Sequence, residues 1–354
     1  MFPALFTWRI IMLRRMLAVV VCLVLVPWLA MANNLLIGSN LGDGNSSTFD
    51  KYDDNGNFLA TGVLDVSRSN HTATKLQNGS IFVAGGIQDP TSWEILDENG
   101  KLLSSGLLMD QRASHAATLL SNGNVFLAGG NLTSGTWEIH SPTGARVGYG
   151  SLLDSRTGGV RAVSLQDGNV WISGSGFGSG ADSTYEIRSV SGALVSSGSL
   201  LNPYSGGKAL KLQNNNVILM GGDSCTGCWE IRTQTGGLVG SGSLENPFNS
   251  GSTAVLLNNG NVLIFGSCYV SHCNAGGSPG TWEIRNPSGG FVSTGSLFDT
   301  RDGAQAQVVS TTDVFITGGN GAPGTWEIRN PSGGLVSQGS LFNTRGSGHT
   351  DTHF

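Results

Sequence analysis

The apolar residues of this chain are grouped in short runs, which are separated by turns rich in glycine, asparagine and serine. One run, residues 124–128, is largely apolar, which predicts a strand that is buried on both faces. Ser121-Asn122-Gly123 precedes it and reads as a hairpin turn, in which Asn-Gly supplies a positive φ. The pattern therefore predicts four short antiparallel strands per unit. In the unit 115–156 the expected strands are 115–120, 124–128, 136–140 and 147–153.

A motif of the form Trp-Glu-Ile repeats along the chain at a nearly constant period. Successive copies are separated by 44, 48, 44, 53 and 44 residues, and Phe49-Asp50 stands 44 residues before the first copy as a degenerate one. Fixed-period similarity of this length indicates a blade that recurs around a propeller. The sequence therefore predicts an all-β, seven-bladed β-propeller over residues 33–354. The six clear copies begin at Trp93, Trp137, Tyr185, Trp229, Trp282 and Trp326.

The first and last segments of the chain are expected to complete one blade together. Residues 34–38 match a second strand, so the first unit has no first strand of its own. The segment 349–354 follows Arg345 and matches residues 71–76, which open the next unit. We therefore expect the C-terminal strand to close blade 1, which removes the free sheet edges of an open array.

These repeats resemble kelch repeats, and the chain is similar in this respect to propellers of the galactose oxidase central-domain superfamily. The resemblance rests on the aromatic residue of the third strand, on the arginine before most first strands, and on a double glycine after the second strand. It implies a closed ring in which the C-terminal strand is the innermost one of its blade. The double glycines are Gly85-Gly86, Gly129-Gly130, Gly221-Gly222 and Gly318-Gly319.

The repeated aromatic, glutamate and arginine residues are interpreted as structural, because a residue found in nearly every blade serves something that all blades share. The aromatic residue is expected to pack between neighbouring blades. The third-strand glutamate, such as Glu94, and the arginine that ends the loop between blades, such as Arg112, fall on one face of the disc and can form ion pairs. The same structural interpretation applies to three histidines at one repeat position, His71, His115 and His349.

The composition favours an exported β protein. Of 354 residues, 54 are glycine and only 12% are charged, which suits short strands joined by tight turns. Residues 1–32 include Arg14 and Arg15, a short apolar run and Ala30-Met31-Ala32, which predict a cleaved signal peptide and a secreted or periplasmic protein. An uncleaved anchor is the alternative, but the apolar run is shorter than the roughly 20 residues that span a bilayer.

Charge argues against two classes of partner. The chain has a net charge of −5, and residues 1–32 hold three arginines and no acid, so the mature chain has 16 basic and 24 acidic residues and a net charge of −8. Basic residues form no cluster in it. We therefore expect no nucleic acid partner, no membrane contact after signal cleavage, and a monomer.

The blades differ most in the loops around blades 5 and 6. The loops that lead into these blades lose the arginine and carry Asn-Pro followed by an aromatic residue, and residues 268–280 form the longest insertion. Strand alternation puts these loops on one face, where exposed aromatic residues suit a sugar or a partner protein. The alternative is that each aromatic residue fills the space of a missing arginine. The candidate binding patch is Tyr204, Phe248, Tyr269 and His272.

Four cysteines of the mature chain form two sequence pairs, Cys225 with Cys228 and Cys268 with Cys273. An even number in an exported protein indicates disulfides, either within each loop or across neighbouring blades. A zinc site made from these cysteines, with or without His272, is the disfavoured alternative in an oxidising compartment. We therefore expect no metal and no other cofactor.

No arrangement of a nucleophile with a base is recognisable, so no catalytic residue is assigned. Copper radical oxidases of the kelch family need paired histidine ligands, and this chain has no adjacent histidine pair. Sugar mutarotases of the kelch type need acidic and cationic groups over the central channel, which the ring of arginines can imitate. The expected function is a non-catalytic binding module for an unidentified protein or glycan. The alternative is a carbohydrate-active enzyme, a sugar mutarotase or oxidase, that uses the same face.

Overall fold

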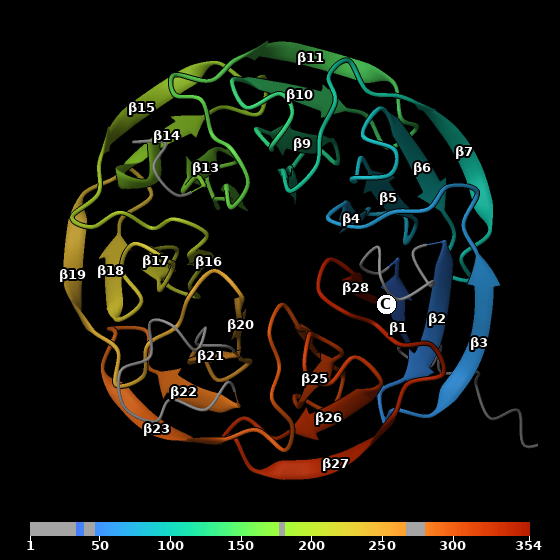
Figure 1. Ribbon diagram of the computed structural model, residues 1–354. Coiled ribbons are helices and arrows are strands. Elements are labelled where there is room, and N and C mark those ends of the chain that lie inside the picture. Colours follow the sequence, from blue (N-terminus) through green and yellow to red (C-terminus); the bar gives the residue numbers. More distant parts are fainter. Residues whose placement is uncertain (1–32, 39–46, 177–180, 267–279) are drawn as a thin grey trace, which may run out of the picture. The chain divides into compact units, whose positions relative to one another are not determined.

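The computed structural model describes residues 33–38, 47–176, 181–266 and 280–354. The predicted signal peptide therefore lies outside the described residues. The described chain forms a ring of seven four-stranded antiparallel sheets (Figure 1), which confirms the seven-bladed β-propeller. None of its segments is a helix that is long and apolar enough to cross a membrane.

The first three blades follow one another in chain order. In blades 2 and 3 the strands run in sequence order from the channel outwards, whereas blade 1 has the C-terminal strand innermost. Blade 1 consists of β28 (Thr350–His353), β1 (Asn33–Ile37), β2 (Thr48–Asp53) and β3 (Phe58–Val63). Blade 2 consists of β4 (Thr72–Lys75), β5 (Ile81–Ala84), β6 (Ser92–Leu96) and β7 (Leu102–Leu107). Blade 3 consists of β8 (Ala116–Leu119), β9 (Val125–Ala128), β10 (Thr136–His140) and β11 (Arg146–Ser151).

The remaining four blades repeat this order. Blade 4 consists of β12 (Arg161–Ser164), β13 (Val170–Ser173), the 3₁₀ turn η1 (Ala181–Ser183), β14 (Thr184–Arg188) and β15 (Leu194–Ser199). Blade 5 consists of β16 (Lys208–Lys211), β17 (Val217–Met220), β18 (Cys228–Arg232) and β19 (Leu238–Ser243). Blade 6 consists of β20 (Ser252–Leu256), β21 (Val262–Gly266), β22 (Thr281–Arg285) and β23 (Phe291–Ser296). Blade 7 consists of β24 (Gln305–Val308), β25 (Val314–Thr317), β26 (Thr325–Arg329) and β27 (Leu335–Ser340).

The C-terminal strand closes the ring as predicted. β28 pairs with β1 in antiparallel register, with Leu36 opposite Asp351 and Ile37 opposite Thr350. The innermost strands of neighbouring blades contact one another in an unbroken cycle, in which β28 lies between β24 and β4 (Figure 1). The two ends of the propeller are therefore joined by main-chain hydrogen bonds within a single sheet.

The strands of blade 3 lie within two residues of their expected bounds, and β9 is buried along its whole length. At the turn that precedes β9, Gly123 has a φ of 84° and donates its amide to the carbonyl of Leu120 at 3.0 Å. This is the left-handed conformation that favours glycine. It explains why a glycine ends this turn in the sequence.

The third-strand aromatic residues pack between blades, as the repeat predicted. The Trp93 ring of blade 2 lies against Gly144, in the turn between the third and fourth strands of blade 3, where a Cβ atom would overlap the ring. Each blade thus places a flat ring on a turn of the next blade, which excludes water from the space between them. The other six pairs are Trp137–Gly192, Tyr185–Gly236, Trp229–Gly289, Trp282–Gly333, Trp326–Gly56 and Phe49–Gly100.

The third-strand acids are buried and pair with the arginine of the loop between blades, which confirms the expected ion pairs. Arg112, for example, donates to Glu138 at 2.7 Å, and the side chains of both residues are fully buried. The same arginine donates to the carbonyl oxygens of Gly129 and Thr136, so it also fixes the end of the second strand. The equivalent pairs are Arg68–Glu94, Arg156–Glu186, Arg301–Glu327 and, in blade 1, Arg345–Asp50.

Five of the seven third-strand acids contact an arginine or a histidine two residues further along their own strand. Residues at positions i and i+2 of a strand point to the same face, so Arg188 reaches Glu186 at 2.7 Å. In blades 3, 4 and 7 the buried carboxylate is therefore held from two directions, by this partner and by the loop arginine. The other pairs of this second kind are His140–Glu138, Arg232–Glu230, Arg285–Glu283 and Arg329–Glu327.

Candidate functional site

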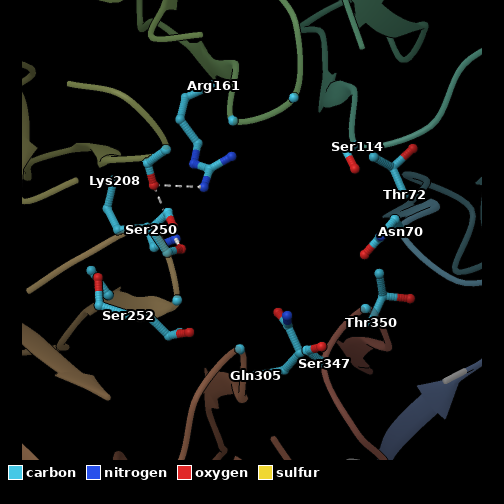
Figure 2. A pocket seen from close by; sticks show the side chains of 18 of the residues that line it. Asn70, Thr72, Ser114, Arg161, Lys208, Ser250, Ser252, Gln305, Ser347 and Thr350 are labelled. Atoms are coloured by element: carbon cyan, nitrogen blue, oxygen red, sulfur yellow. Dashed lines mark hydrogen bonds between the residues drawn. The ribbon is translucent and has the colours of Figure 1, made fainter. Parts of the chain in front are cut away.

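A cavity of about 1310 Å³ opens at one end of the central channel (Figure 2). Its rim is formed by the loops between blades and by the loops between second and third strands, which is the face that the sequence analysis singled out. Its wall is formed by the innermost strands. The rim residues are small or polar, among them Asn70, Ser114, Asn131, Ser250, Asn249 and Ser347.

The rim loops are tied to one another by main-chain hydrogen bonds. The amide of Asn70 donates to the carbonyl of Gly348 at 2.9 Å, and the amide of Ser114 donates to the carbonyl of Asn70 at 2.8 Å. On the far side, the amide of Gly303 donates to the carbonyl of Gly251 at 2.7 Å. These bonds fix the loops relative to one another, so the polar groups of the rim are held in place before any ligand arrives.

One position of the innermost strands lines the cavity in six of the seven blades and differs between blades. It is defined by its partner on the second strand, for example Arg161 opposite Ser173 and Lys208 opposite Met220. Only blades 4 and 5 place a cation there, and these two blades are neighbours. The equivalent residues of the other blades are Thr72, Ala116, Thr253, Gln305 and Thr350.

Arg161 is partly buried and has no acidic partner among the described residues. Its guanidinium donates to the carbonyl oxygens of Val160 at 2.9 Å and Gly206 at 3.3 Å (Figure 2). Removal from bulk water lowers its pKa to about 10. At neutral pH Arg161 therefore stays charged, and the rest of its donors face a cavity rather than a carboxylate.

Lys208 lies beside Arg161 and is also partly buried without an ion pair in the described chain. Its ammonium group donates to the carbonyl of Ser250 at 3.0 Å. Burial lowers its pKa well below the usual value, and the positive charge of Arg161 lowers it further, while Asp223 and Asp302 act in the opposite direction. Two neighbouring cations on a cavity wall repel one another, and a bound anion would relieve that repulsion.

Asp351 brings a carboxyl group to the same cavity from β28. The Thr317 hydroxyl donates to its Oδ2 at 2.5 Å, and its side chain is only 2% exposed. Burial raises the pKa of Asp351 to about 7, against the opposing effects of the Thr317 hydrogen bond and the Arg345 charge. Asp351 can therefore exist in either protonation state near neutral pH.

The three histidines at the shared repeat position connect neighbouring blades. His71 of blade 2 contacts the Thr350 hydroxyl of blade 1 at 2.8 Å, and His115 of blade 3 contacts the Thr72 hydroxyl of blade 2 at 2.9 Å. Burial is the main cause that lowers the pKa of both, to about 3 for His115. His71 and His115 are therefore neutral hydrogen-bonding groups at physiological pH, in keeping with their structural interpretation.

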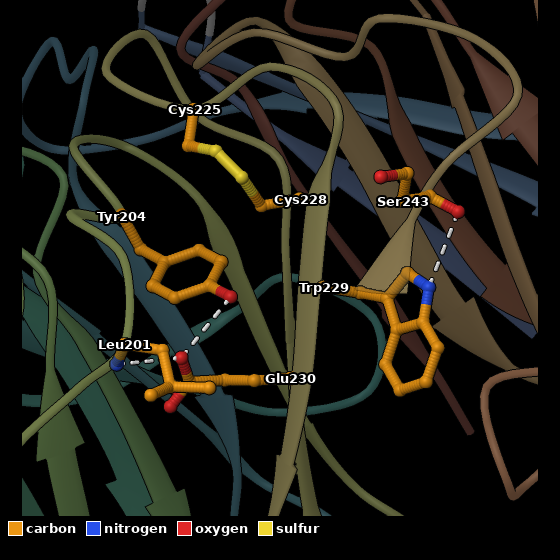
Figure 3. The surroundings of a disulfide bond; sticks show 7 residues. All are labelled: Leu201, Tyr204, Cys225, Cys228, Trp229, Glu230 and Ser243. Atoms are coloured by element: carbon orange, nitrogen blue, oxygen red, sulfur yellow. Dashed lines mark hydrogen bonds between the residues drawn. A yellow bond between two sulfur atoms is a disulfide. The ribbon is translucent and has the colours of Figure 1, made fainter. Parts of the chain in front are cut away.

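The structure buries two members of the predicted patch. Tyr204 is 2% exposed and Phe248 is 0% exposed, so neither side chain can form part of an exposed binding surface. Tyr204 donates its hydroxyl to Glu230 at 3.4 Å, from the place that arginine occupies in other blades (Figure 3). The burial of these two residues agrees with the space-filling alternative. The remaining members, Tyr269 and His272, lie outside the described residues.

Blades 5 and 6 can lack the loop arginine because their third-strand glutamates still pair with the arginine two residues further along the same strand. Arg232 donates to Glu230 at 2.7 Å, and Arg285 pairs with Glu283. The buried charge therefore stays balanced when an aromatic side chain replaces the arginine.

Cys225 and Cys228 are joined as a disulfide within the loop before β18, with their Cα atoms 5.5 Å apart (Figure 3). This is the local pairing that the sequence allowed. Cys268 and Cys273 lie outside the described residues, so their pairing stays a prediction. Within the described ranges, no three histidine, cysteine, aspartate or glutamate side chains lie close enough together to hold a metal ion.

Comparison with known proteins shows the fold. A fungal alcohol oxidase of the AA5 family, solved in complex with copper, matches with a TM-score of 0.63 and 16% identity, over 89% of this chain and 74% of that chain. A catalytically inactive virginiamycin B lyase from Staphylococcus aureus, solved with quinupristin, matches with a TM-score of 0.57 and 8% identity, over 80% of this chain and 92% of that chain. No family model and no curated protein sequence matches the chain.

Sequence reasoning missed Arg161, Lys208 and Asp351, although a signal for them existed. When the seven first strands are aligned, Asp351 stands where the other blades have alanine, and the two cations stand where most blades have threonine, alanine or glutamine. The loops drew attention because they differ in length as well as in sequence. The innermost strands carry the more informative difference.

Proposed function

We propose that this protein is an exported binding module whose central cavity holds a small, hydroxyl-rich anion, with an acidic saccharide as the ligand class. The observation that carries the proposal is the pair Arg161 and Lys208, two neighbouring cations without an acidic partner on the wall of a large cavity. A guanidinium with free donors suits a carboxylate, which it can bind through two parallel hydrogen bonds.

The walls and rim support a saccharide rather than a simple anion. Hydroxyl and amide side chains line the same cavity as the two cations, including Ser250, Gln305 and Thr350 (Figure 2). Sugar hydroxyls are bound by groups of this kind, which can both donate and accept hydrogen bonds. A volume of about 1310 Å³ leaves room for a saccharide of more than one ring.

The test measures binding of D-glucuronate and D-galacturonate, with D-glucose and D-galactose as neutral probes, by titration calorimetry. We expect only the acidic sugars to bind, and we expect Arg161→Gln to weaken their binding by about 10- to 100-fold, as the loss of a charge-assisted hydrogen bond predicts. Arg146→Gln is the matched control, because Arg146 lies exposed on the outer strand β11.

Equal binding of neutral and acidic sugars, or full binding by Arg161→Gln, would contradict the proposal. Chemical turnover of a sugar by the wild-type protein would favour the alternative, a carbohydrate-active enzyme that uses the same cavity. Binding and turnover are measured on the same samples, because the sugars can be recovered after the titration and analysed.

A further inference from the structure

Asp351 is the only acidic residue on the seven innermost strands, all of which lie in the described part of the chain. We propose that Asp351 contacts the ligand directly, and that its oxygen Oδ1 accepts a hydrogen bond from a hydroxyl or ammonium group of that ligand. This inference rests on the proposed function, because it assumes a ligand that Arg161 and Lys208 hold.

The free oxygen of Asp351 is the first reason. Its Oδ2 accepts a hydrogen bond from Thr317, but Oδ1 is buried and has no hydrogen-bond partner. The side chain is 2% exposed and lines the cavity. A buried carboxylate oxygen without a partner is costly, and a ligand donor in the cavity would supply the missing bond.

The place of Asp351 in the ring is the second reason. β28 is the third innermost strand from β12 in one direction, through β8 and β4, and the third from β16 in the other, through β20 and β24. The carboxyl group therefore stands across the cavity from the two cations. A ligand that reaches both walls must carry its negative group at one end and a hydrogen-bond donor at the other.

The repeat itself supplies the third reason. Six blades have alanine at this position, for example Ala73 opposite Val83, and blade 1 has Asp351 opposite Leu36. The blade architecture therefore does not need a carboxyl group here. A residue that breaks a repeat at a cost in stability, and that lines a cavity, is typical of a binding site.

The surroundings hold the carboxyl group in place. The Thr317 hydroxyl, which positions Oδ2, also contacts the His349 Nε2 atom at 3.1 Å, and His349 Nδ1 donates to the carbonyl of Gly346 at 2.7 Å. Asp351 is thus oriented by a short chain of hydrogen bonds. This arrangement leaves Oδ1 as the carboxyl oxygen that has no hydrogen bond.

Four other titratable groups surround the Asp351 carboxyl group. His349 Nε2 lies 3.6 Å from Oδ1, and Arg345 and Tyr52 lie within electrostatic range. His71, on the neighbouring strand β4, is bound to the adjacent Thr350 hydroxyl. On the blade 7 side, Asp302 in the entering loop also lines the cavity and can titrate, whereas Gln305 cannot. Replacement of Asp351 by asparagine removes the charge of that one residue and leaves the surrounding titratable groups in place.

The experiment compares Asp351→Ala and Asp351→Asn with the wild type, using D-glucuronate and its 2-amino-2-deoxy analogue as probes. We expect Asp351→Ala to fold, because it restores the alanine of the other blades, and to bind at least about tenfold more weakly. Asp351→Asn keeps an acceptor but cannot ionise, so we expect it to lose the change in affinity that the wild type shows between about pH 6 and about pH 8. Glu98→Ala, in the exposed turn before β7, is the control.

The outcomes separate this inference from the proposed function. Unchanged affinity in Asp351→Ala, while Arg161→Gln still loses binding, overturns the inference alone. A lower melting temperature of Asp351→Ala at about pH 8 also overturns it, because that result assigns the ionised carboxyl group to the architecture. Failure of both acids to bind the wild type overturns the proposed function and this inference together. Preference for the amino sugar identifies an ammonium donor, and equal binding of the two acids identifies a hydroxyl donor.

Discussion

The double support of the buried glutamates predicts that two nearly identical arginines differ in their effect on stability. Arg188 and Arg232 each follow the glutamate of their strand by two residues, and each donates to a turn glycine carbonyl at 3.0 Å. They are 6% and 8% exposed. Each also lies over an aromatic ring of the preceding blade, at 5.9 Å and 6.0 Å. The two arginines therefore differ chiefly in which partners their glutamate keeps when the arginine is replaced.

The remaining partners set the expected magnitudes. In Arg188→Gln, Glu186 keeps the loop arginine Arg156, so the loss is that of hydrogen bonds to a charged group, about 2 kcal/mol. In Arg232→Gln, Glu230 keeps only the Tyr204 hydroxyl and a main-chain amide. A buried charge without an opposite charge costs about 3–5 kcal/mol. We therefore expect Arg232→Gln to be the more destabilising by about 2 kcal/mol.

Urea denaturation followed by tryptophan fluorescence measures this difference at neutral pH. An unfolding entropy of about 2.1 cal/mol/K per residue converts about 2 kcal/mol into about 3 °C of melting temperature for a domain of this size. The double variant Tyr204→Arg, Arg232→Gln provides a rescue, because it gives blade 5 the arrangement of blade 2, where Arg68 alone supports Glu94. Equal destabilisation by the two single variants, or no recovery in the double variant, would refute the reasoning.

Two further predictions concern β28. The pKa of Asp351, about 7, is raised above its unfolded value, so its ionisation costs stability only above about pH 4 and costs most above about pH 7. Asp351→Ala should therefore be about 1 kcal/mol less stable than the wild type at about pH 4, because it lacks the Thr317 hydrogen bond, and about 3 kcal/mol more stable at about pH 8; a pH-independent difference would contradict this. Removal of residues 346–354 exposes the edge of β1, including the fully buried Leu36, and should make the protein insoluble or lower its melting temperature by many degrees. A soluble truncated protein with an unchanged melting temperature would disprove the closure.

Much of the fold could be predicted from the sequence because propeller blades repeat both their chemistry and their spacing. The position of β28 followed from the match between residues 349–354 and 71–76, a comparison that needs no coordinates. The packing of Trp93 and its equivalents followed from the size of the ring and its recurrence. In both cases the prediction came from comparing seven imperfect copies of the repeat, because a single copy would not have supported it.

The site was less predictable because exposure depends on neighbours that are remote in sequence. Tyr204 and Phe248 each follow a proline in a loop, and only the folded propeller shows that their side chains are buried. Their burial was nevertheless within reach of the sequence, because Arg232 lies on the same face of its strand as Glu230 and replaces the lost charge. Which side of an innermost strand faces the channel depends on the tilt of the blade, which the strand pattern does not encode.

The arginine that follows a buried glutamate by two residues in blades 5 and 6 also has a consequence for how this surface can change. In blades 5 and 6, the loops around Tyr204 and Phe248 no longer contribute a charge that the interior needs. Their sequences can therefore be redesigned at the mouth of the channel, provided that an aromatic ring still fills the space beneath. New recognition specificity can be engineered there without rebuilding the scaffold.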